Sequence, residues 1–146
     1  MSTPVPPFTQ DRYRAYLAAF NKPDHDTLFR DFFAPDVTLV TLGNVLRGEA
    51  GIRTFYGYFH SCVREHIDLI AFYPCPGGAW AHVAMRLEAF EALTQEGLEA
   101  IGITGMPAIP KGLAYENEMF IHYALDANNR LTLLRCAEYV PPRESI

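Results

Sequence analysis

The sequence predicts an α+β fold, in which three N-terminal helices precede a mostly antiparallel sheet. Two observations support this order. Before residue 65, apolar residues recur in three segments at helical spacing, and after it their period changes to two. Helices followed by a meander of strands are typical of α+β domains. With 146 residues and 49% hydrophobic content, the chain has room for a single domain over residues 1–146, with its core at about 9–140 and short flexible termini.

Three amphipathic segments predict the helices. The first spans residues 9–21, the second runs from a cap at Asp24 or Asp26 to Pro35, and the third covers residues 49 to about 64. Each carries an apolar stripe at intervals of three and four residues: Tyr13, Tyr16, Leu17 and Phe20; then Leu28, Phe29, Phe32 and Phe33; then Ile52, Phe55, Tyr56, Phe59 and Val63.

Short β-branched or alternating segments predict the strands. The Gly- and Pro-containing residues 102–112 are expected to form a mobile loop at a rim, and residues 126–129 a hairpin turn. The expected strands are residues 37–42, 66–73, 79–91, an irregular one at 95–104, 113–125 and 131–139.

Composition and motifs argue against several functional classes. The net charge of −5, with no basic run longer than two residues, predicts that the chain does not bind nucleic acid. No uncharged stretch is long enough to span a membrane and no signal-peptide pattern is present, so we expect a cytoplasmic protein. Three scattered cysteines and five histidines without metal-binding spacing predict reduced thiols and no metal site. Because nucleotide-binding motifs are also absent, we expect no cofactor and chemistry by ordinary side chains.

Five short phrases, in this order and spacing, carry a family resemblance: residues 15–21, 33–38, 48–56, 105–112 and 125–131. Over roughly residues 9–140 the chain resembles the nuclear transport factor 2-like superfamily, and within it the SnoaL-like branch of polyketide cyclases, ketosteroid isomerases and dehydratases. The resemblance implies a conical α+β barrel, whose strongly curved sheet encloses one deep pocket for a small hydrophobic molecule. It also implies a homodimer formed through the outer face of the sheet. Because this superfamily contains enzymes and non-enzymes, the fold alone does not give the function.

The resemblance also assigns individual positions. Tyr16 falls where ketosteroid isomerases have the tyrosine that donates a hydrogen bond to the substrate oxyanion, and Tyr56 falls where a supporting tyrosine lies. The positions of the isomerase general base and protonated acid carry Thr41 and Ile121 instead. Steroid isomerisation by that mechanism is therefore not expected.

Strand alternation adds further candidates for the pocket. One choice of phase turns Trp80, His82, Arg86 and Glu88 inward, and we prefer this phase because it agrees with the resemblance. His82 is then a candidate general acid–base, similar to the strand histidine of scytalone dehydratase, or a histidine satisfied by a neighbouring carbonyl. On the last two strands the inward sets include Tyr115, Asn117 and Met119, and Cys136 and Glu138. Glu138 is a candidate catalytic carboxylate, or a solvated residue at the rim.

These candidates predict a cofactor-free isomerase, cyclase or dehydratase that acts on a polyketide-, terpenoid- or alkaloid-like intermediate. Glu138 or His82 would move the proton, and Tyr16, Tyr115 and Asn117 would hold the oxygen that gains charge. Two alternatives stay open. One is an epoxide hydrolase or epoxide-opening cyclase that uses Glu88, Arg86 and Glu138. The other is a non-catalytic binding or dimerisation module, with His82 and Glu138 on separate faces and a pocket lined only by apolar atoms.

Overall fold

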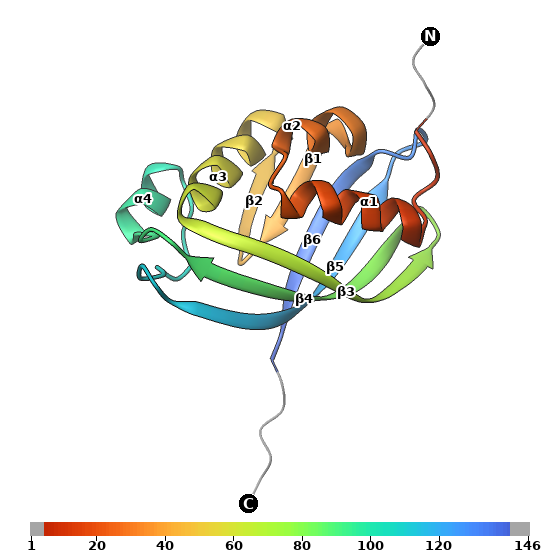
Figure 1. Ribbon diagram of the computed structural model, residues 1–146. Helices are drawn as coiled ribbons and strands as arrows, with labels where there is room; N and C mark the ends of the chain where they lie inside the picture. Colours follow the sequence, from red (N-terminus) through yellow and green to blue (C-terminus); the bar gives the residue numbers. More distant parts are fainter. Residues whose placement is uncertain (1–4, 141–146) are drawn as a thin grey trace, which may run out of the picture.

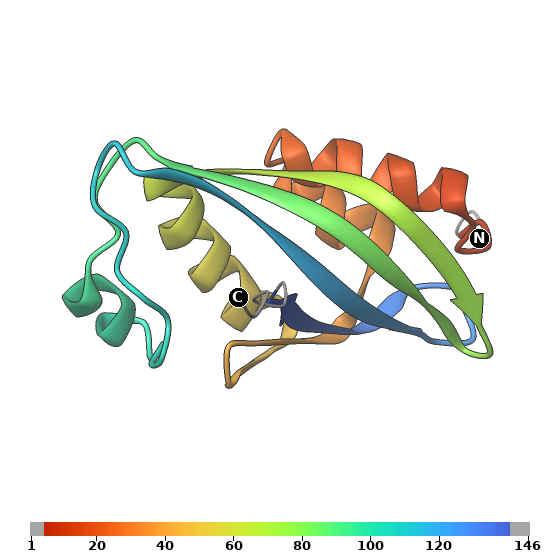
Figure 2. The same cartoon turned by 90° about the horizontal axis from the view of Figure 1, so that it is seen from below.

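A curved six-stranded sheet wraps around the helices, which cover its concave side (Figure 1, Figure 2). The computed structural model describes residues 5–140, so most of the termini expected to be flexible lie outside the described residues. The strand order is β2-β1-β6-β5-β4-β3, and every neighbouring pair is antiparallel except β1 and β6. The predicted α+β class and mostly antiparallel sheet are therefore confirmed.

The elements have the following bounds. The helices are α1 (Gln10–Asn21), α2 (His25–Thr27), the π-helix η1 (Leu28–Phe32), α3 (Gly48–Cys62) and α4 (Gln95–Ala100). The strands are β1 (Phe33–Thr41), β2 (Asn44–Arg47), β3 (Val63–Cys75), β4 (Gly78–Ala89), β5 (Ala114–Leu125) and β6 (Leu131–Tyr139).

Helix α1 shows how the N-terminal segment is fixed to the sheet. The Thr9 side chain accepts a hydrogen bond from the Arg12 backbone N–H (3.2 Å) and caps the helix. The predicted apolar stripe is buried in the core. At the other end, the Asn21 side chain forms two hydrogen bonds with the backbone of Ile67 in β3 (3.0 and 2.8 Å). These bonds hold the end of α1 against the strand that forms one wall of the interior.

Three segments differ from the sequence prediction. The second helix is the single turn α2 continued by η1, and β1 follows immediately. Leu42 and Gly43, both with positive φ, turn the chain back into β2, so β1 and β2 form a hairpin that was not predicted. Residues 95–100 form a helix rather than an irregular strand, because the Thr94 side chain accepts a hydrogen bond from the Gly97 N–H (3.0 Å) and caps α4.

The register of β4, β5 and β6 decides which side chains face the interior. Met85 in β4 pairs with Asn117 in β5, and Met119 in β5 pairs with Glu138 in β6. Paired residues project to the same face of a sheet, and so do residues two apart on one strand. All four side chains therefore project to the concave face, towards the helices. In the described part of the chain, no helix is both long and apolar enough to cross a membrane.

Candidate active site

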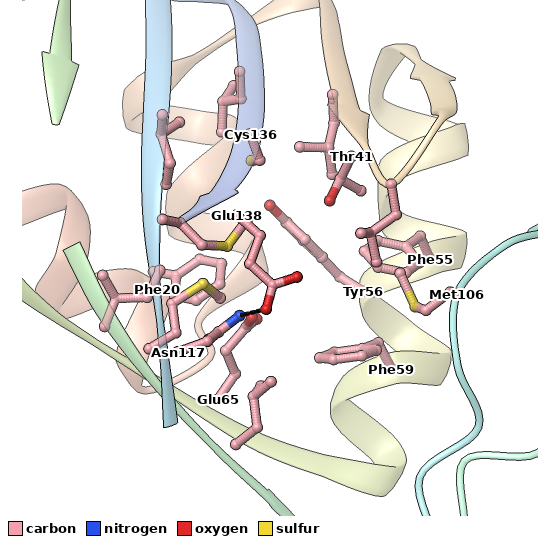
Figure 3. Close-up of a pocket in the computed structure, with 18 of the residues that line it drawn as sticks. Phe20, Thr41, Phe55, Tyr56, Phe59, Glu65, Met106, Asn117, Cys136 and Glu138 are labelled. Carbon is pink, nitrogen blue, oxygen red and sulfur yellow. Dashed lines mark hydrogen bonds between the residues drawn. The ribbon is translucent and has the colours of Figure 1, made fainter. Parts of the chain in front are cut away.

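A cavity of about 320 Å³ lies between the concave face of the sheet and the helices (Figure 3). Its lining is mainly apolar and includes three phenylalanines (Phe20, Phe55 and Phe59) and four tyrosines (Tyr16, Tyr56, Tyr115 and Tyr123). Met106, Pro107 and Ile109, from the segment after α4, complete the wall. Such a volume and lining suit a small, largely hydrophobic molecule.

The segment that carries Met106, predicted to be a rim loop, does border the cavity. Backbone hydrogen bonds of 2.9 Å in both directions join Leu93 to Ile109. The Asn44 side chain donates to the Thr104 carbonyl (2.8 Å) and accepts from the Thr104 N–H (3.2 Å). These contacts define the position of residues 102–112 at the rim of the cavity. Opening and closing of the cavity by this segment stays a prediction.

Two carboxylates, from β3 and β6, face this cavity. The Glu65 side chain, on β3, is only 9% exposed. Glu138, near the end of β6, is exposed at the mouth and accepts a hydrogen bond from Asn117 Nδ2 (3.4 Å). Figure 3 shows Glu65, Asn117 and Glu138 gathered on one side of the cavity. A mainly apolar cavity with two carboxylates is equipped for proton transfer.

Glu65 is held by a chain of two histidines. His60 on α3, whose side chain is 5% exposed, lies with Nε2 3.0 Å from Glu65 Oε1. His60 Nδ1 lies 2.8 Å from Nε2 of His25, the first residue of α2. Because an ionised carboxylate only accepts, His60 Nε2–H donates to Glu65, and in the neutral ring Nδ1 accepts from His25. This chain fixes the orientation of the Glu65 carboxylate and leads from the cavity to a half-buried histidine.

The tyrosines supply hydroxyl groups that stay protonated. Burial raises the pKa of Tyr16 and of Tyr56 well above the ordinary value. Both rings are buried, both line the cavity, and neither hydroxyl has a hydrogen-bond partner among the described residues. Each hydroxyl can therefore donate a hydrogen bond to a ligand oxygen that gains negative charge.

Most of the predicted pocket residues do line the cavity. They are Tyr16, Tyr56, Tyr115, Asn117, Met119 and Glu138. Glu65 and His60 were not among the predicted residues. Glu65 lies between the expected end of the third helix and the expected start of the next strand, so strand alternation assigns its side chain to neither face. The available signal was that Glu65 and the apolar Ile67 lie two residues apart and share a face.

The inward placement expected for Trp80, His82 and Arg86 is wrong. These side chains lie on the outer face of β4, because Met85 and Leu87 take the inward positions opposite Asn117 and Tyr115. His82 Nε2 lies 2.8 Å from Glu118 Oε2, and its ring stacks on Phe120 at 4.5 Å. Trp80 is 42% exposed and stacks on His122 at 4.6 Å, and Arg86 lies 3.6 Å from Asp68.

The cluster of Glu88, Arg86 and Glu138, suggested for epoxide opening, is not formed. Glu88 lies two residues from Arg86 on the same strand, and both are exposed on the outer face. Glu138 instead belongs to the cavity. Among residues 5–140, no three His, Cys, Asp or Glu side chains come together in a way that would hold a metal ion.

Comparison with known proteins gives structural matches only. No family model and no curated protein matches the sequence. A protein of Xanthomonas campestris proposed to be a polyketide cyclase is 20% identical, with a TM-score of 0.67 over 85% of this chain and 84% of that one. A protein of Catenulispora acidiphila with a ketosteroid isomerase-like fold, in complex with trimethylamine, is 14% identical, with a TM-score of 0.64 over 88% of this chain and 85% of that one.

A third solved structure, an LEH-like epoxide hydrolase of Mycobacterium tuberculosis, is 15% identical, with a TM-score of 0.64 over 87% of this chain and 79% of that one. NTF2-like proteins of unknown function match as well. Identities this low carry information about the fold and not about the reaction. The chain has the NTF2-like fold, which ketosteroid isomerase-like proteins share. The order and spacing of its five short sequence phrases predicted this fold.

Proposed function

We propose that this protein is a cofactor-independent enzyme that isomerises, cyclises or dehydrates a small hydrophobic metabolite by general acid–base catalysis. One observation carries the proposal. The Glu65 carboxylate, 9% exposed, faces a mainly apolar cavity and is oriented from behind by His60 at 3.0 Å. A carboxylate that is positioned in this way and shielded from water is suited to remove a proton from bound substrate.

The cavity residues divide into three proposed roles. Glu65 takes the proton, and His60 is a positioning residue that keeps the carboxylate turned towards the substrate. Glu138 is the second proton-transferring carboxylate, since it borders the same cavity from β6. Tyr16 donates a hydrogen bond to the substrate oxygen that becomes negative, and the Tyr56 hydroxyl is a second donor for the same oxygen. Tyr115, Asn117 and Met119 bind the remainder of the substrate.

The magnitudes expected for such a site are moderate. A positioned general acid or base contributes about 10²–10⁴-fold in rate. A hydroxyl donor placed at the developing oxyanion contributes roughly 10²–10³-fold. Together these effects suit proton abstraction next to a carbonyl group, which is the first step of isomerisation and of several cyclisations and dehydrations.

The alternative of a non-catalytic module receives partial support. His82 and Glu138 do lie on separate faces of the sheet, as that alternative requires. The cavity, however, contains two carboxylates, an amide and four tyrosines, and is not lined by apolar atoms alone. Epoxide opening by a carboxylate–arginine cluster has less support, because no arginine among the described residues lines the cavity.

Pairing of two copies through the outer face of the sheet belongs to the same proposal. Trp80 and Tyr73, which pair across β4 and β3, are 42% and 57% exposed, and Tyr139 is 40% exposed near the end of β6. Exposed apolar side chains that gather on one face are typical of a protein interface. Sedimentation of the wild type and of Trp80→Lys distinguishes a dimer through this face from a monomer.

Exchange of the α-protons of 1-tetralone in D₂O, followed by mass spectrometry, tests the proposed base without knowledge of the natural substrate. Glu65 removes a proton from the carbon next to the carbonyl, and Tyr16 donates to the enolate oxygen. The Glu65 carboxyl group then exchanges this proton with D₂O and returns a deuteron to the carbon. We expect Glu65→Gln to slow the exchange about 10²-fold or more, since the change is nearly isosteric and removes the base. Glu138→Gln should slow it as well.

Glu116→Gln is the matched control, because Glu116 precedes Asn117 on β5 and is exposed on the opposite face. Thermal unfolding of all four proteins verifies that they fold alike. Wild-type exchange no faster than buffer, or full exchange in Glu65→Gln, would remove the basis of the proposal.

A further inference from the structure

The polar groups of the cavity are rich in hydrogen-bond acceptors and poor in positive charge. Two carboxylates line it, and no Lys, Arg or His among the described residues does. His60 stands behind Glu65, so that carboxylate already receives a donor. Glu138 receives only the 3.4 Å contact from Asn117 and forms no ion pair with any residue of the described chain.

Asn117 adds a further acceptor beside Glu138. Its Nδ2 donates to Glu138 Oε1, which sets the orientation of the amide, since the reverse orientation would place two oxygens together. Its Oδ1 is buried and has no partner among the described residues. A buried acceptor without a donor is costly. Because molecules of the size of water do not reach this oxygen, it adds partial negative charge beside Glu138 and is not itself a binding atom.

The neighbouring tyrosine reports the same negative potential. Burial raises the pKa of Tyr115, and the charges of Glu138 and then Glu65 raise it further. A field that opposes formation of a phenolate favours a cation at the same place. Aromatic rings, which attract cations over their faces, also line this cavity, among them Phe59 and Tyr56.

From these observations we propose that the ligand of the cavity carries a basic amine, protonated at neutral pH, whose ammonium group binds the Glu138 carboxylate at the cavity mouth. This inference rests on the proposed function, and it narrows the substrate class to hydrophobic amines. With an amine bound, Glu138 pairs with the ammonium group instead of acting as the second proton-transferring carboxylate, and Glu65, held by His60, carries the proton transfer alone.

Three indole probes of nearly equal size test the charge preference. Tryptamine carries an ammonium group, tryptophol a hydroxyl at the same place, and indole-3-acetate a carboxylate. Affinities measured by isothermal titration calorimetry at pH 7 and low salt should favour tryptamine over tryptophol by about tenfold, which corresponds to one favourable charge pair at a partly exposed site. Indole-3-acetate should bind more weakly than tryptophol.

Two variants test whether Glu138 causes the preference for tryptamine over tryptophol. Glu138→Gln should bring the tryptamine and tryptophol affinities to within about threefold of each other, a difference well below one charge pair, and should leave tryptophol binding unchanged. Glu116→Gln, which removes the same charge from the opposite face of β5, should keep the wild-type preference. Raised salt should weaken tryptamine binding and leave tryptophol binding unaffected.

Equal affinity of tryptamine and tryptophol for the wild type, absence of tryptamine binding, or an unchanged preference in Glu138→Gln would each overturn the inference. The proposed function fails by a different result, because 1-tetralone is neutral and its exchange depends on Glu65. Exchange that requires Glu65, together with no preference for tryptamine, would keep the enzyme and discard the amine.

Discussion

His60→Phe removes the donor that holds the Glu65 carboxylate, while a ring of similar size keeps the packing against Phe20, Tyr56 and Phe59. The Glu65 and His60 side chains are 9% and 5% exposed, so water screens them little. Removing the hydrogen-bond donor of a buried group costs about 1–3 kcal/mol, and more when the group left unpaired is a carboxylate. We take about 3 kcal/mol, because Glu65 borders a cavity that water can enter. At roughly 2–4 °C per kcal/mol for a chain of this size, Tm should fall by about 6–12 °C.

A double-mutant cycle measures the free energy of the interaction between His60 and Glu65. His60→Phe also removes the partner of His25, but this loss occurs with or without Glu65 and cancels in the cycle. Glu65→Leu alone leaves His60 Nε2–H without an acceptor and should cost about 1–3 kcal/mol. The double variant leaves neither group unpaired, so its loss should be smaller than the sum by about 2 kcal/mol.

Urea unfolding at pH 7, followed by far-ultraviolet circular dichroism, measures all four free energies of unfolding. Losses that add to within about 0.5 kcal/mol would show that His60 and Glu65 do not interact, and would refute the orientation of the proposed base.

Three further results are expected. Burial and then His60 lower the pKa of His25, so the folded protein binds a proton at His25 less readily than the unfolded chain does. Tm should therefore fall as pH drops below about 6.5, and the fall should be less steep in His25→Gln. The control His66→Gln, which alters an exposed histidine, should show the same dependence of Tm on pH as the wild type. Burial raises the pKa of Cys136 to about 12, so iodoacetamide at pH 8 should label it only after unfolding, and native labelling faster than at Cys75 would contradict this. Amides of residues 102–112 should exchange hydrogen faster than those of β4 and slow with bound ligand; equal protection in the free protein would exclude gating.

The order of elements could be predicted from the sequence because periodicity is a local property. The stripe on α1, the long strands β3 to β6 and the hairpin at residues 126–129 all appear in the structure. The hairpin between β1 and β2 could not be seen, because Leu42 occupies a positive-φ position that Asn or Gly usually marks. Helix α4 was not predicted, although Thr94 and the acidic Glu96 are ordinary signals of a helix start.

The phase of β4 shows why the site was predicted only in part. Both alternating sets of β4 contain apolar residues, so its sequence does not distinguish the inner from the outer face. The phase is settled by the pairing of Met85 with Asn117, a long-range contact that no local pattern contains. On β5 and β6 the prediction of Asn117 and Glu138 as inward residues is confirmed.

The pair of His60 and Glu65 was missed for a different reason. His60 lies in the last turn of α3 and Glu65 at the start of β3, so the two residues lie on either side of the point where the helical period gives way to the strand period. Neither period alone places both side chains. Their contact depends on the angle at which the chain leaves α3, which only the packed structure defines.

The crystal structure of the complex with 1-tetralone tests the central claim most directly, because it locates the reacting carbon relative to the base. We expect the ligand inside the cavity, with its α-carbon about 3–3.5 Å from a Glu65 carboxylate oxygen, the separation of a reactive complex. Its carbonyl oxygen should face the hydroxyl of Tyr16 or Tyr56. A ligand on the outer face near Trp80 and His82, or one in the cavity with its α-carbon turned away from Glu65, would contradict the proposed mechanism.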